Sequence, residues 1–220
     1  MCALTLLRGL YAITPDWSSS ACLFEAVEAA LLGGCSLIQY RDKHPLTDKR
    51  QSRAIRLQSL CRLHGATLLI NDDLQLAIEI GADGVHLGRD DADLSVARKL
   101  LAEGKIIGAS CYNNLALAKK ASAHADYLAF GSVYSSQTKP QAKSAGMAIF
   151  KQASRLQRPL CAIGGIRLDN ARPLIKAGAT MLAVCSDLFG SPGTPATPEQ
   201  VRLQSARYRQ LLDDGNFQHN

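Results

Sequence analysis

Two carboxylates stand just beyond two neighbouring apolar runs, and their placement suits a metal ion. The run Thr67–Ile70 is followed closely by Asp72, and the run Gly84–Leu87 is followed closely by Asp91. In parallel α/β folds, the carboxyl ends of the strands form the edge at which ligands bind. Paired carboxylates at this edge offer the oxygen ligands that Mg²⁺ prefers, and Mg²⁺ bridges readily to phosphate groups. We therefore predict a Mg²⁺ site at Asp72 and Asp91.

Other acidic residues of this stretch fit a structural role better. Asp73 and Asp93 each precede a short amphipathic segment, which is the position of a helix N-cap. A carboxylate there accepts a hydrogen bond from the first helical turn and opposes the positive end of the helix dipole. Capping is the alternative for every acid from Asp90 to Asp93. We assign it to Asp73 and Asp93 and keep the metal prediction for the other pair.

Basic, amide and hydroxyl side chains follow the other predicted strands. Gln39, Arg41 and Lys43 alternate along the chain, so their side chains can point to one side while Tyr40 and Asp42 point to the other. A solvated strand edge would show the same alternation. The further strand-end candidates are Asn71, Arg89, Ser110, Ser135, Ser136, Thr138, Lys139, Gly164, Gly165, Cys185 and Ser186. This set suits phosphate groups and a metal ion, and it contains no evident nucleophile–base pair.

A glycine pair after one strand and a serine after the next indicate a phosphate site. Gly164-Gly165 and Ser186 match the site that the last two βα loops form in many barrels. Barrels with unrelated chemistry share this feature, and a tight glycine turn without a ligand is the alternative. Cys185 lies beside it, but no histidine is placed to activate the thiol, so we exclude a thiol enzyme.

Eight near-continuously apolar runs alternate with amphipathic segments, as expected for strands buried on both faces. Eight such units in 220 residues predict an α/β fold, a single-domain (β/α)₈ TIM barrel. A doubly wound sheet is the alternative, but no glycine-rich fingerprint follows the first strand. The predicted strands are Gly9–Ile13, Ser36–Tyr40, Thr67–Ile70, Gly84–Leu87, Lys105–Ala109, Tyr127–Gly131, Leu160–Ile163 and Met181–Val184. We expect one domain over residues 1–220, with the barrel over about 9–190, a last helix over about 199–212 and a frayed tail from 213 to 220.

Composition narrows the class of protein further. No apolar run approaches the ~18 residues of a membrane span, and the N-terminus does not resemble a signal peptide. Seven scattered cysteines, an odd number without a C-x-x-C motif, suit free thiols in a reducing cytoplasm. The net charge of +6 is compatible with anionic small-molecule substrates, while the dispersed basic residues argue against nucleic acid. The sequence does not fix the oligomeric state, so a homo-oligomer stays open.

Several motifs in a fixed order resemble one enzyme family. They are LYAITPD at 10–16, Q-x-R-x-K at 39–43, IND at 70–72, ADGVHLG at 82–88, IIGAS at 106–110, DYLAFGSVYSSQTK at 126–139 and AIGGI at 162–166. Together they are similar to the thiamine-phosphate synthase (thiamine-phosphate pyrophosphorylase) family over about residues 10–188. The resemblance implies a transferase that joins a hydroxymethylpyrimidine diphosphate to a thiazole phosphate, giving thiamine phosphate and diphosphate.

The resemblance also implies a role for each matching residue. It implies that Asp72 and Asp91 hold Mg²⁺ and that the expected catalytic residues are Arg41, Lys43, Ser110 and Lys139. It implies that the diphosphate is bound by Arg41, Lys43, Asn71 and Lys139. It also implies that Gln39 and Ser110 lie close to the pyrimidine or the diphosphate. It places the thiazole phosphate at Ser136, Thr138, Gly165 and Ser186, and we count Gly164, Cys185 and Arg89 among the substrate-binding residues. The family's dissociative chemistry needs charge neutralisation and close positioning in place of a protein nucleophile.

Three positions depart from the family pattern. The mildest is Ser136, which stands where threonine is common and keeps the hydroxyl. Arg89 stands where glutamine is frequent, and it is either another diphosphate contact or a partner of Asp90 or Asp91 that weakens the metal site. Tyr112 stands where related thiazole tautomerases use a histidine for proton transfer. The missing histidine and the retained acids argue against a tautomerase. That enzyme and a barrel that binds thiamine precursors without turnover remain the alternatives.

Overall fold

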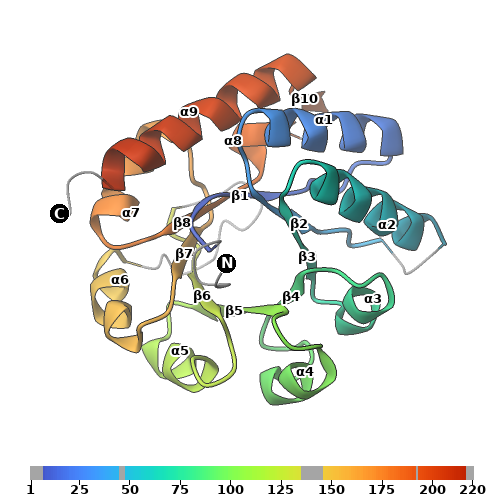
Figure 1. Ribbon diagram of the computed structural model, residues 1–220. Coiled ribbons are helices and arrows are strands. Elements are labelled where there is room, and N and C mark those ends of the chain that lie inside the picture. Colours follow the sequence, from blue (N-terminus) through green and yellow to red (C-terminus); the bar gives the residue numbers. More distant parts are fainter. Residues whose placement is uncertain (1–6, 45–47, 135–145, 192, 217–220) are drawn as a thin grey trace.

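Eight parallel strands close into a barrel at the centre of the molecule (Figure 1). The computed structural model describes residues 7–44, 48–134, 146–191 and 193–216. Each strand pairs with the next one in the sequence, and the eighth pairs with the first. The strands are β1 (Gly9–Ile13), β2 (Leu37–Tyr40), β3 (Thr67–Asn71), β4 (Gly84–Leu87), β5 (Ile106–Tyr112), β6 (Tyr127–Phe130), β7 (Leu160–Ile163) and β8 (Met181–Val184). This closed topology confirms the predicted (β/α)₈ barrel.

Helices form an outer ring around the strands, and α9 lies alongside α1 (Figure 1). The helices are α1 (Ser20–Leu32), α2 (Asp48–Leu63), α3 (Leu74–Glu79), α4 (Leu94–Leu100), α5 (Leu115–Ala121), α6 (Ala148–Ala153), α7 (Arg172–Lys176), α8 (Ser186–Phe189) and α9 (Pro198–Asn216). Short 3₁₀ helices, η2 (Ser154–Leu156) and η3 (Leu168–Asn170), follow α6 and precede α7. The two predicted caps are confirmed, because Asp73 accepts a hydrogen bond from Leu76 N and Asp93 accepts from Ser95 N and Val96 N.

The structure extends several elements beyond their predicted ends. Strand β5 continues past Ala109 to Tyr112, with a register shift between Ser110 and Tyr112. Helix α9 continues to Asn216, about one turn beyond the predicted end. The stretch 191–198, whose Pro, Gly and Thr content predicts a loop, instead carries part of a small hairpin in which β9 (Gly190–Ser191) pairs with β10 (Thr194–Pro195). These short elements depend on hydrogen bonds to neighbouring segments and leave no periodic pattern in the sequence.

Two apolar clusters stabilise the barrel. Alternate strand residues point into the barrel, where Tyr11, Leu69, Tyr127 and Met181 are buried. The intervening residues pack outward against the helices in a larger cluster that includes Leu57. Burying one large apolar side chain contributes about 1.5–3 kcal/mol, so both layers contribute strongly to stability. Because side chains fill the barrel interior, a substrate can bind only at an end of the barrel.

Asp187, the second residue of α8, anchors the C-terminal helix α9 to the loops after β7 and β8. Asp187 Oδ2 accepts hydrogen bonds from Tyr208 Oη at 2.7 Å, from Gln204 Nε2 at 2.8 Å and from Leu168 N at 3.2 Å. Ser205 Oγ, also on α9, donates to the carbonyl of Ala30 on α1. Helix α9 therefore fixes the β7 and β8 loops relative to the first helix of the barrel.

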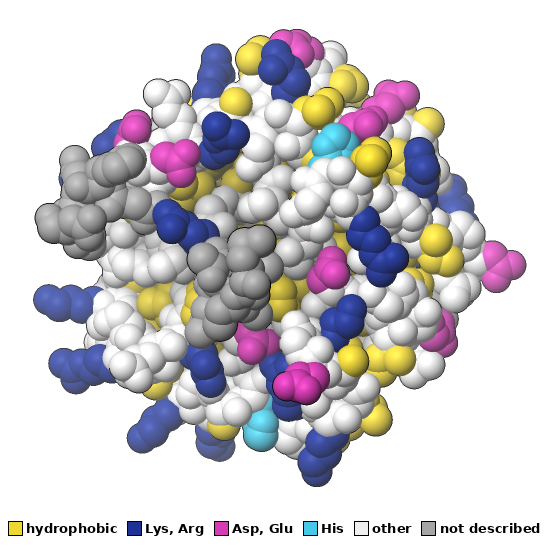
Figure 2. Space-filling view, viewed as in Figure 1, with side chains coloured by type: hydrophobic (Ala, Val, Ile, Leu, Met, Phe, Trp, Pro, Cys, Tyr) yellow, Lys and Arg dark blue, Asp and Glu magenta, His cyan; other side chains and the backbone are white. Residues whose placement is uncertain are grey.

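The surface shows dispersed charge. Lys and Arg side chains are scattered among acidic and uncharged ones on the face seen in Figure 2. No helix within the described ranges is long and apolar enough to cross a membrane. The six cysteines of the described chain are free thiols.

Candidate active site

The two predicted metal ligands meet at the carboxyl ends of β3 and β4. Asp72 and Asp91 are within hydrogen-bonding distance of each other, and Lys43 forms an ion pair with Asp72 from the end of β2. Asp91 Oδ2 also accepts a hydrogen bond from Gly88 N at 2.6 Å. The backbone of Asp72 has a positive φ of 64°, which residues other than glycine seldom adopt. The fold therefore assembles three predicted residues from three adjacent strands.

The two carboxyl groups of this pair differ in pKa. Burial raises the pKa of Asp72, but hydrogen bonds from Lys43 and Asp91 and the charge of Lys43 lower it by more, so it lies below its usual value. Burial raises the pKa of Asp91, and the neighbouring Asp72 raises it further despite the hydrogen bond from Gly88. Two ionised carboxylates this close repel each other, and a divalent cation relieves that repulsion because it neutralises both. The donor set therefore fits Mg²⁺.

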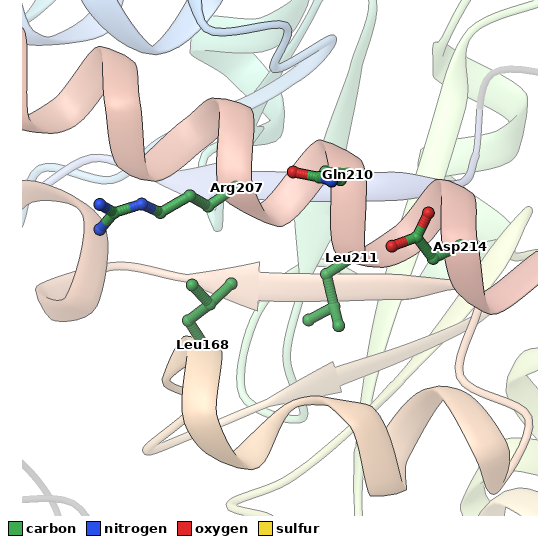
Figure 3. Close-up of a pocket in the computed structure, with 5 residues that line it drawn as sticks. All are labelled: Leu168, Arg207, Gln210, Leu211 and Asp214. Carbon is green, nitrogen blue, oxygen red and sulfur yellow. The ribbon is translucent and has the colours of Figure 1, made fainter.

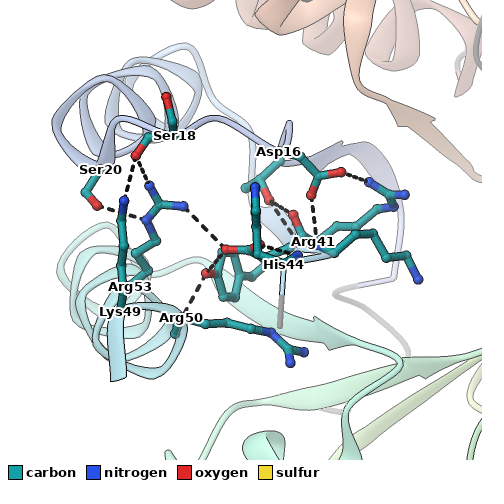
Figure 4. Close-up of polar contacts among 12 residues, drawn as sticks. Asp16, Ser18, Ser20, Arg41, His44, Lys49, Arg50 and Arg53 are labelled. Carbon is teal, nitrogen blue, oxygen red and sulfur yellow. Dashed lines mark hydrogen bonds and ion pairs between the residues drawn. The ribbon is translucent and has the colours of Figure 1, made fainter. Parts of the chain in front are cut away.

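The two cations at the end of β2 are each paired with an acid from a neighbouring strand, and Figure 4 shows the pair of Arg41 with Asp16. Arg41 Nη1 lies 2.6 Å from Asp16 Oδ2, and Lys43 N donates to Asp16 Oδ1 at 3.0 Å. The Arg41 and Lys43 side chains remain 36% and 54% exposed, so an anionic substrate can reach them. Asp16 is absent from the residues predicted above. It stands three residues after the last residue of β1, so the strand-end rule that selected Asp72 could also have selected Asp16.

Tyr40 and Asp42, which alternate with Arg41 and Lys43 along the chain, belong to a separate layer of hydrogen-bonded side chains. Tyr40 Oη donates to Asp42 at 2.8 Å, and Arg53 Nη1 lies 3.3 Å from the same carboxylate. Arg53 Nη2 also donates to Ser18 O at 2.6 Å, so α2 is tied to the segment before α1 (Figure 4). Tyr40 and Asp42 therefore point away from Arg41 and Lys43, as the alternation predicted.

A second acidic cluster lies at the edge of this layer. Possible ligand atoms of Asp16, Asp42 and His44 lie within 4.8 Å of one another. Burial raises the pKa of Asp42, but hydrogen bonds from His44 and Tyr40 lower it by more. The carboxylates of this cluster serve as hydrogen-bond acceptors for Arg41, His44 and Tyr40, and the pair on β3 and β4 stays the predicted metal site.

Arg89 and Tyr112, which both depart from the family pattern, contact each other. The guanidinium carbon of Arg89 lies 5.0 Å from the centroid of the Tyr112 ring, and Arg89 N donates to Tyr112 Oη at 3.4 Å. Tyr112 follows the register shift of β5 and has a positive φ of 54°. In the part of the chain that the structure describes, no ion pair joins Arg89 to Asp90 or Asp91. Arg89 is therefore held against Tyr112 and does not occupy the carboxylate pair of Asp72 and Asp91.

A buried row of polar side chains connects two predicted substrate residues. Gln39 Nε2 donates to Tyr11 Oη at 2.7 Å, and Tyr11 Oη lies 2.8 Å from Tyr127 Oη. Tyr127 Oη lies 2.7 Å from His86 Nδ1, and His86 Nε2 lies 2.8 Å from Ser110 Oγ. Burial lowers the pKa of His86 to about 4 against the opposing charge of Asp72, so the ring is neutral. His86 is therefore a hydrogen-bonded core histidine.

The loops after β7 and β8 form the other side of the barrel mouth. Gly164 and Gly165 have positive φ values of 103° and 63°, and a Cβ on Gly164 would lie 2.1 Å from Ser132 Oγ. The neighbouring backbone is fixed, because Tyr134 N donates to Gly164 O at 3.1 Å and Asn170 Nδ2 donates to Gly165 O at 3.0 Å. Only glycine fits this turn without strain.

The β8 side of the mouth carries the remaining described candidates. Helix α8 begins at Ser186, directly after Cys185. Burial raises the pKa of the Cys185 thiol to about 11, which makes it a poor nucleophile.

Asn71 is the last residue of β3 and lies beside Asp72. The predicted residues Ser136, Thr138 and Lys139 lie outside the described residues.

A separate hollow of about 230 Å³ lies between α9 and η3 (Figure 3). It is lined by Leu168, Arg207, Gln210, Leu211 and Asp214, and it contains none of the predicted site residues.

Known proteins similar to this chain share its fold and sequence. The family profile described as thiamine monophosphate synthase matches residues 10–188. A thiamine-phosphate synthase of Thiobacillus denitrificans is 52% identical over 205 residues, which cover 92% of this chain and 97% of the relative. One of Chromobacterium violaceum is 48% identical over 191 residues, which cover 86% and 92%. The solved thiamine phosphate pyrophosphorylase from Pyrococcus furiosus superposes with a TM-score of 0.83 at 32% identity, covering 96% of this chain and 98% of that one. The match along the sequence and the shared barrel agree, and the chain belongs to the thiamine monophosphate synthase family.

Proposed function

We propose that this protein is a thiamine-phosphate synthase that requires Mg²⁺. It joins a hydroxymethylpyrimidine diphosphate to a thiazole phosphate and releases diphosphate. The observation that carries this proposal is the grouping of Lys43, Asp72 and Asp91 at three adjacent strand ends. A site that pairs a cation with a carboxylate couple suits a substrate whose leaving group is a metal-bound diphosphate.

The residues around the acid pair would hold the diphosphate. Asp72 and Asp91 would bind Mg²⁺, which supplies charge neutralisation to phosphate oxygens when bound. Arg41 and Lys43 would exchange their present acid partners for phosphate oxygens, since both side chains are partly exposed. Asn71 adjoins the acid pair, and Lys139 is proposed as a further cation for the same group.

The reaction proceeds by loss of the leaving group before attack. The bond between the pyrimidine methylene carbon and the diphosphate oxygen breaks, and its electron pair leaves with the diphosphate. The electron-rich pyrimidine supports the methylene cation, and the thiazole nitrogen donates its lone pair to that carbon. Arg41 and Lys43 favour the first step by neutralising the developing negative charge. The second step needs the thiazole held close, and this is a matter of positioning.

The β7 and β8 loops would position the thiazole through its phosphate. Backbone N–H groups in a glycine turn and at the start of a helix are a common anion site in barrels. We assign this role to Gly164, Gly165, Cys185 and Ser186, together with Ser136 and Thr138. With its phosphate fixed on one side of the mouth, the thiazole nitrogen can face the carbon that carries the diphosphate.

Two other functions are less consistent with the site. A thiazole tautomerase would use a histidine at position 112 for proton transfer, but this chain has Tyr112 there, held against Arg89. A non-catalytic precursor-binding barrel would have no use for a cation and two carboxylates placed at one point. We further propose a cytoplasmic location, which suits the free thiols, and small-molecule substrates without nucleic acid.

The test is product formation by the purified protein. Both substrates are supplied with Mg²⁺, and thiamine phosphate and diphosphate are measured by mass spectrometry and a coupled assay. We expect both products in equal amounts, and neither when one substrate is omitted. Isomerisation of a thiazole substrate would support the tautomerase instead. Tight substrate binding by calorimetry without any product would support the non-catalytic barrel.

A further inference from the structure

The five-membered polar row inside the barrel connects residues of five strands. Gln39 lies on β2, Tyr11 on β1, Tyr127 on β6, His86 on β4 and Ser110 on β5. The first four side chains are at most 5% exposed, and Ser110 is partly exposed at the mouth. Each contact between neighbours is 2.7 to 2.8 Å long. A continuous row of this kind inside an otherwise apolar core must satisfy every donor and acceptor, because an unpaired buried group is costly.

The barrel sequence makes room for this row at one position. Gly108 of β5 stands between His86 of β4 and Tyr127 of β6 in the strand register. A Cβ at Gly108 would lie 2.1 Å from the Tyr127 ring. Without that carbon, the two rings meet over β5 and stack with centroids 5.6 Å apart. The contact between His86 and Tyr127 is therefore a built feature of the barrel.

The hydrogen-bond direction along the row follows from its first member. The amide nitrogen of Gln39 can only donate, so Tyr11 accepts from it and gives its own hydroxyl hydrogen to Tyr127. Tyr127 then donates to His86 Nδ1, which must carry no proton. The ring proton therefore resides on Nε2 and is donated to Ser110 Oγ. This leaves the hydroxyl hydrogen of Ser110 free to point into the mouth.

We propose that Tyr11, Tyr127 and His86 are positioning residues that fix the Ser110 hydroxyl as a hydrogen-bond donor toward the bound pyrimidine diphosphate. This inference rests on the proposed function for its substrate, while the geometry of the row stands without it. A donor at this point stabilises negative charge that develops as the diphosphate leaves, whereas a serine turned inward would present only its lone pairs. The gain is one of preorganisation, since the hydroxyl need not reorient during the reaction.

The opposite direction of the row has a distinct signature. If the Gln39 amide were rotated so that its oxygen faced Tyr11, every hydrogen bond would reverse. His86 would then carry its proton on Nδ1, and the Ser110 hydroxyl would donate inward to Nε2. The tautomer of His86 therefore reports the direction of the Ser110 hydroxyl.

The first test is the tautomer of His86, measured by ¹H–¹⁵N correlation spectroscopy of the histidine side chains at neutral pH. The His86→Gln variant assigns the resonance. We expect a neutral ring protonated on Nε2, both in the free protein and with the pyrimidine diphosphate bound under conditions without turnover. A ring protonated on Nδ1, or a doubly protonated ring, would overturn the proposal. The result does not depend on whether the protein makes thiamine phosphate.

The second test is kinetic and uses a double-mutant cycle. Tyr127→Phe and Ser110→Ala should each lower kcat about tenfold, the usual cost of one hydrogen bond, with little change in the KM for the thiazole phosphate. The double variant should be no slower than Ser110→Ala, because Tyr127 acts through Ser110. Ser110→Thr, which keeps the hydroxyl, should retain kcat within about threefold. Independent, multiplying losses would contradict the proposal.

Ser205→Ala is the matched control for removing a buried hydroxyl. Ser205 of α9 is buried, donates to the carbonyl of Ala30 on α1, and has no contact with the row. It should lose thermal stability as Tyr127→Phe does, with kcat within about twofold of the wild type. An equal loss of kcat in both variants would mean that Tyr127 acts only through stability. If the wild type forms no product at all, the proposed function fails, and the tautomer measurement alone decides the row.

Discussion

The two sides of the barrel mouth differ in the chemical groups that they offer to a ligand. After β1, β2, β3 and β4, charged side chains are paired with one another. Lys43 forms an ion pair with Asp72, and Arg41 forms one with Asp16. At the ends of β7 and β8, the glycine turn at Gly164 offers backbone in place of charge. Side chains can exchange partners when a ligand arrives, whereas a tight backbone turn is fixed before it arrives. We infer that the first side handles charge that changes during the reaction and the second holds a phosphate that does not change.

The largest expected effect comes from removing one carboxylate of the charged side. Asp72→Asn or Asp91→Asn should lower turnover by at least about 100-fold at saturating Mg²⁺, because each takes away a metal ligand. Diphosphate release measures the rate, and circular dichroism checks the fold. Asp93→Asn is the matched control, since asparagine caps a helix as well as aspartate does. Wild-type rates in the Asp72 or Asp91 variants would remove the metal assignment.

The next effect comes from adding a methyl group to the uncharged side. Gly164→Ala should raise the KM for the thiazole phosphate about tenfold or more, because the new Cβ would collide with Ser132 and move the turn. Gly178→Ala is the control, with a similar positive φ but no atom within 4 Å of the added carbon. Steady-state kinetics with each substrate varied in turn gives the result. A loss confined to the pyrimidine diphosphate would place the phosphate site elsewhere.

The charged side should also respond to pH. The raised pKa of Asp91 means that its proton competes with Mg²⁺ at a higher pH than an ordinary aspartate proton would. Affinity for Mg²⁺ should therefore be constant above that pKa and fall by up to about tenfold per pH unit below it. Calorimetric titration of Mg²⁺ across the acidic range measures this. Unchanged affinity down to the ordinary aspartate pKa of about 3.9 would contradict the raised pKa of Asp91.

The smallest effect is expected for Arg89. Because its guanidinium lies over Tyr112 and forms no ion pair with Asp90 or Asp91 in the described chain, Arg89→Gln should change kcat/KM by less than about threefold. The rate of diphosphate release gives the answer. A tenfold loss would make Arg89 a diphosphate contact, and a tenfold gain would mean that it opposes the metal.

Much of this fold and of the charged side could be predicted from the sequence. Buried parallel strands are near-continuously apolar, so the eight runs and the acids that follow two of them stand out. Asp72, Asp91 and Lys43 are predictable because strand ends of a barrel converge whatever the sequence separation. The Arg89–Tyr112 contact was not, because it depends on the register shift in β5. The row from Gln39 to Ser110 depends on side-chain contacts among five strands, and no local pattern encodes them.

The most direct test of the account is the dependence of diphosphate release on Mg²⁺. The purified protein is given both substrates in excess EDTA, and Mg²⁺ is then added above the chelator. We predict that release is abolished in EDTA and restored by Mg²⁺ in the wild type, with no restoration in Asp72→Asn. Release that continues unchanged in EDTA would contradict the assignment of the carboxylate pair on β3 and β4 as the metal site.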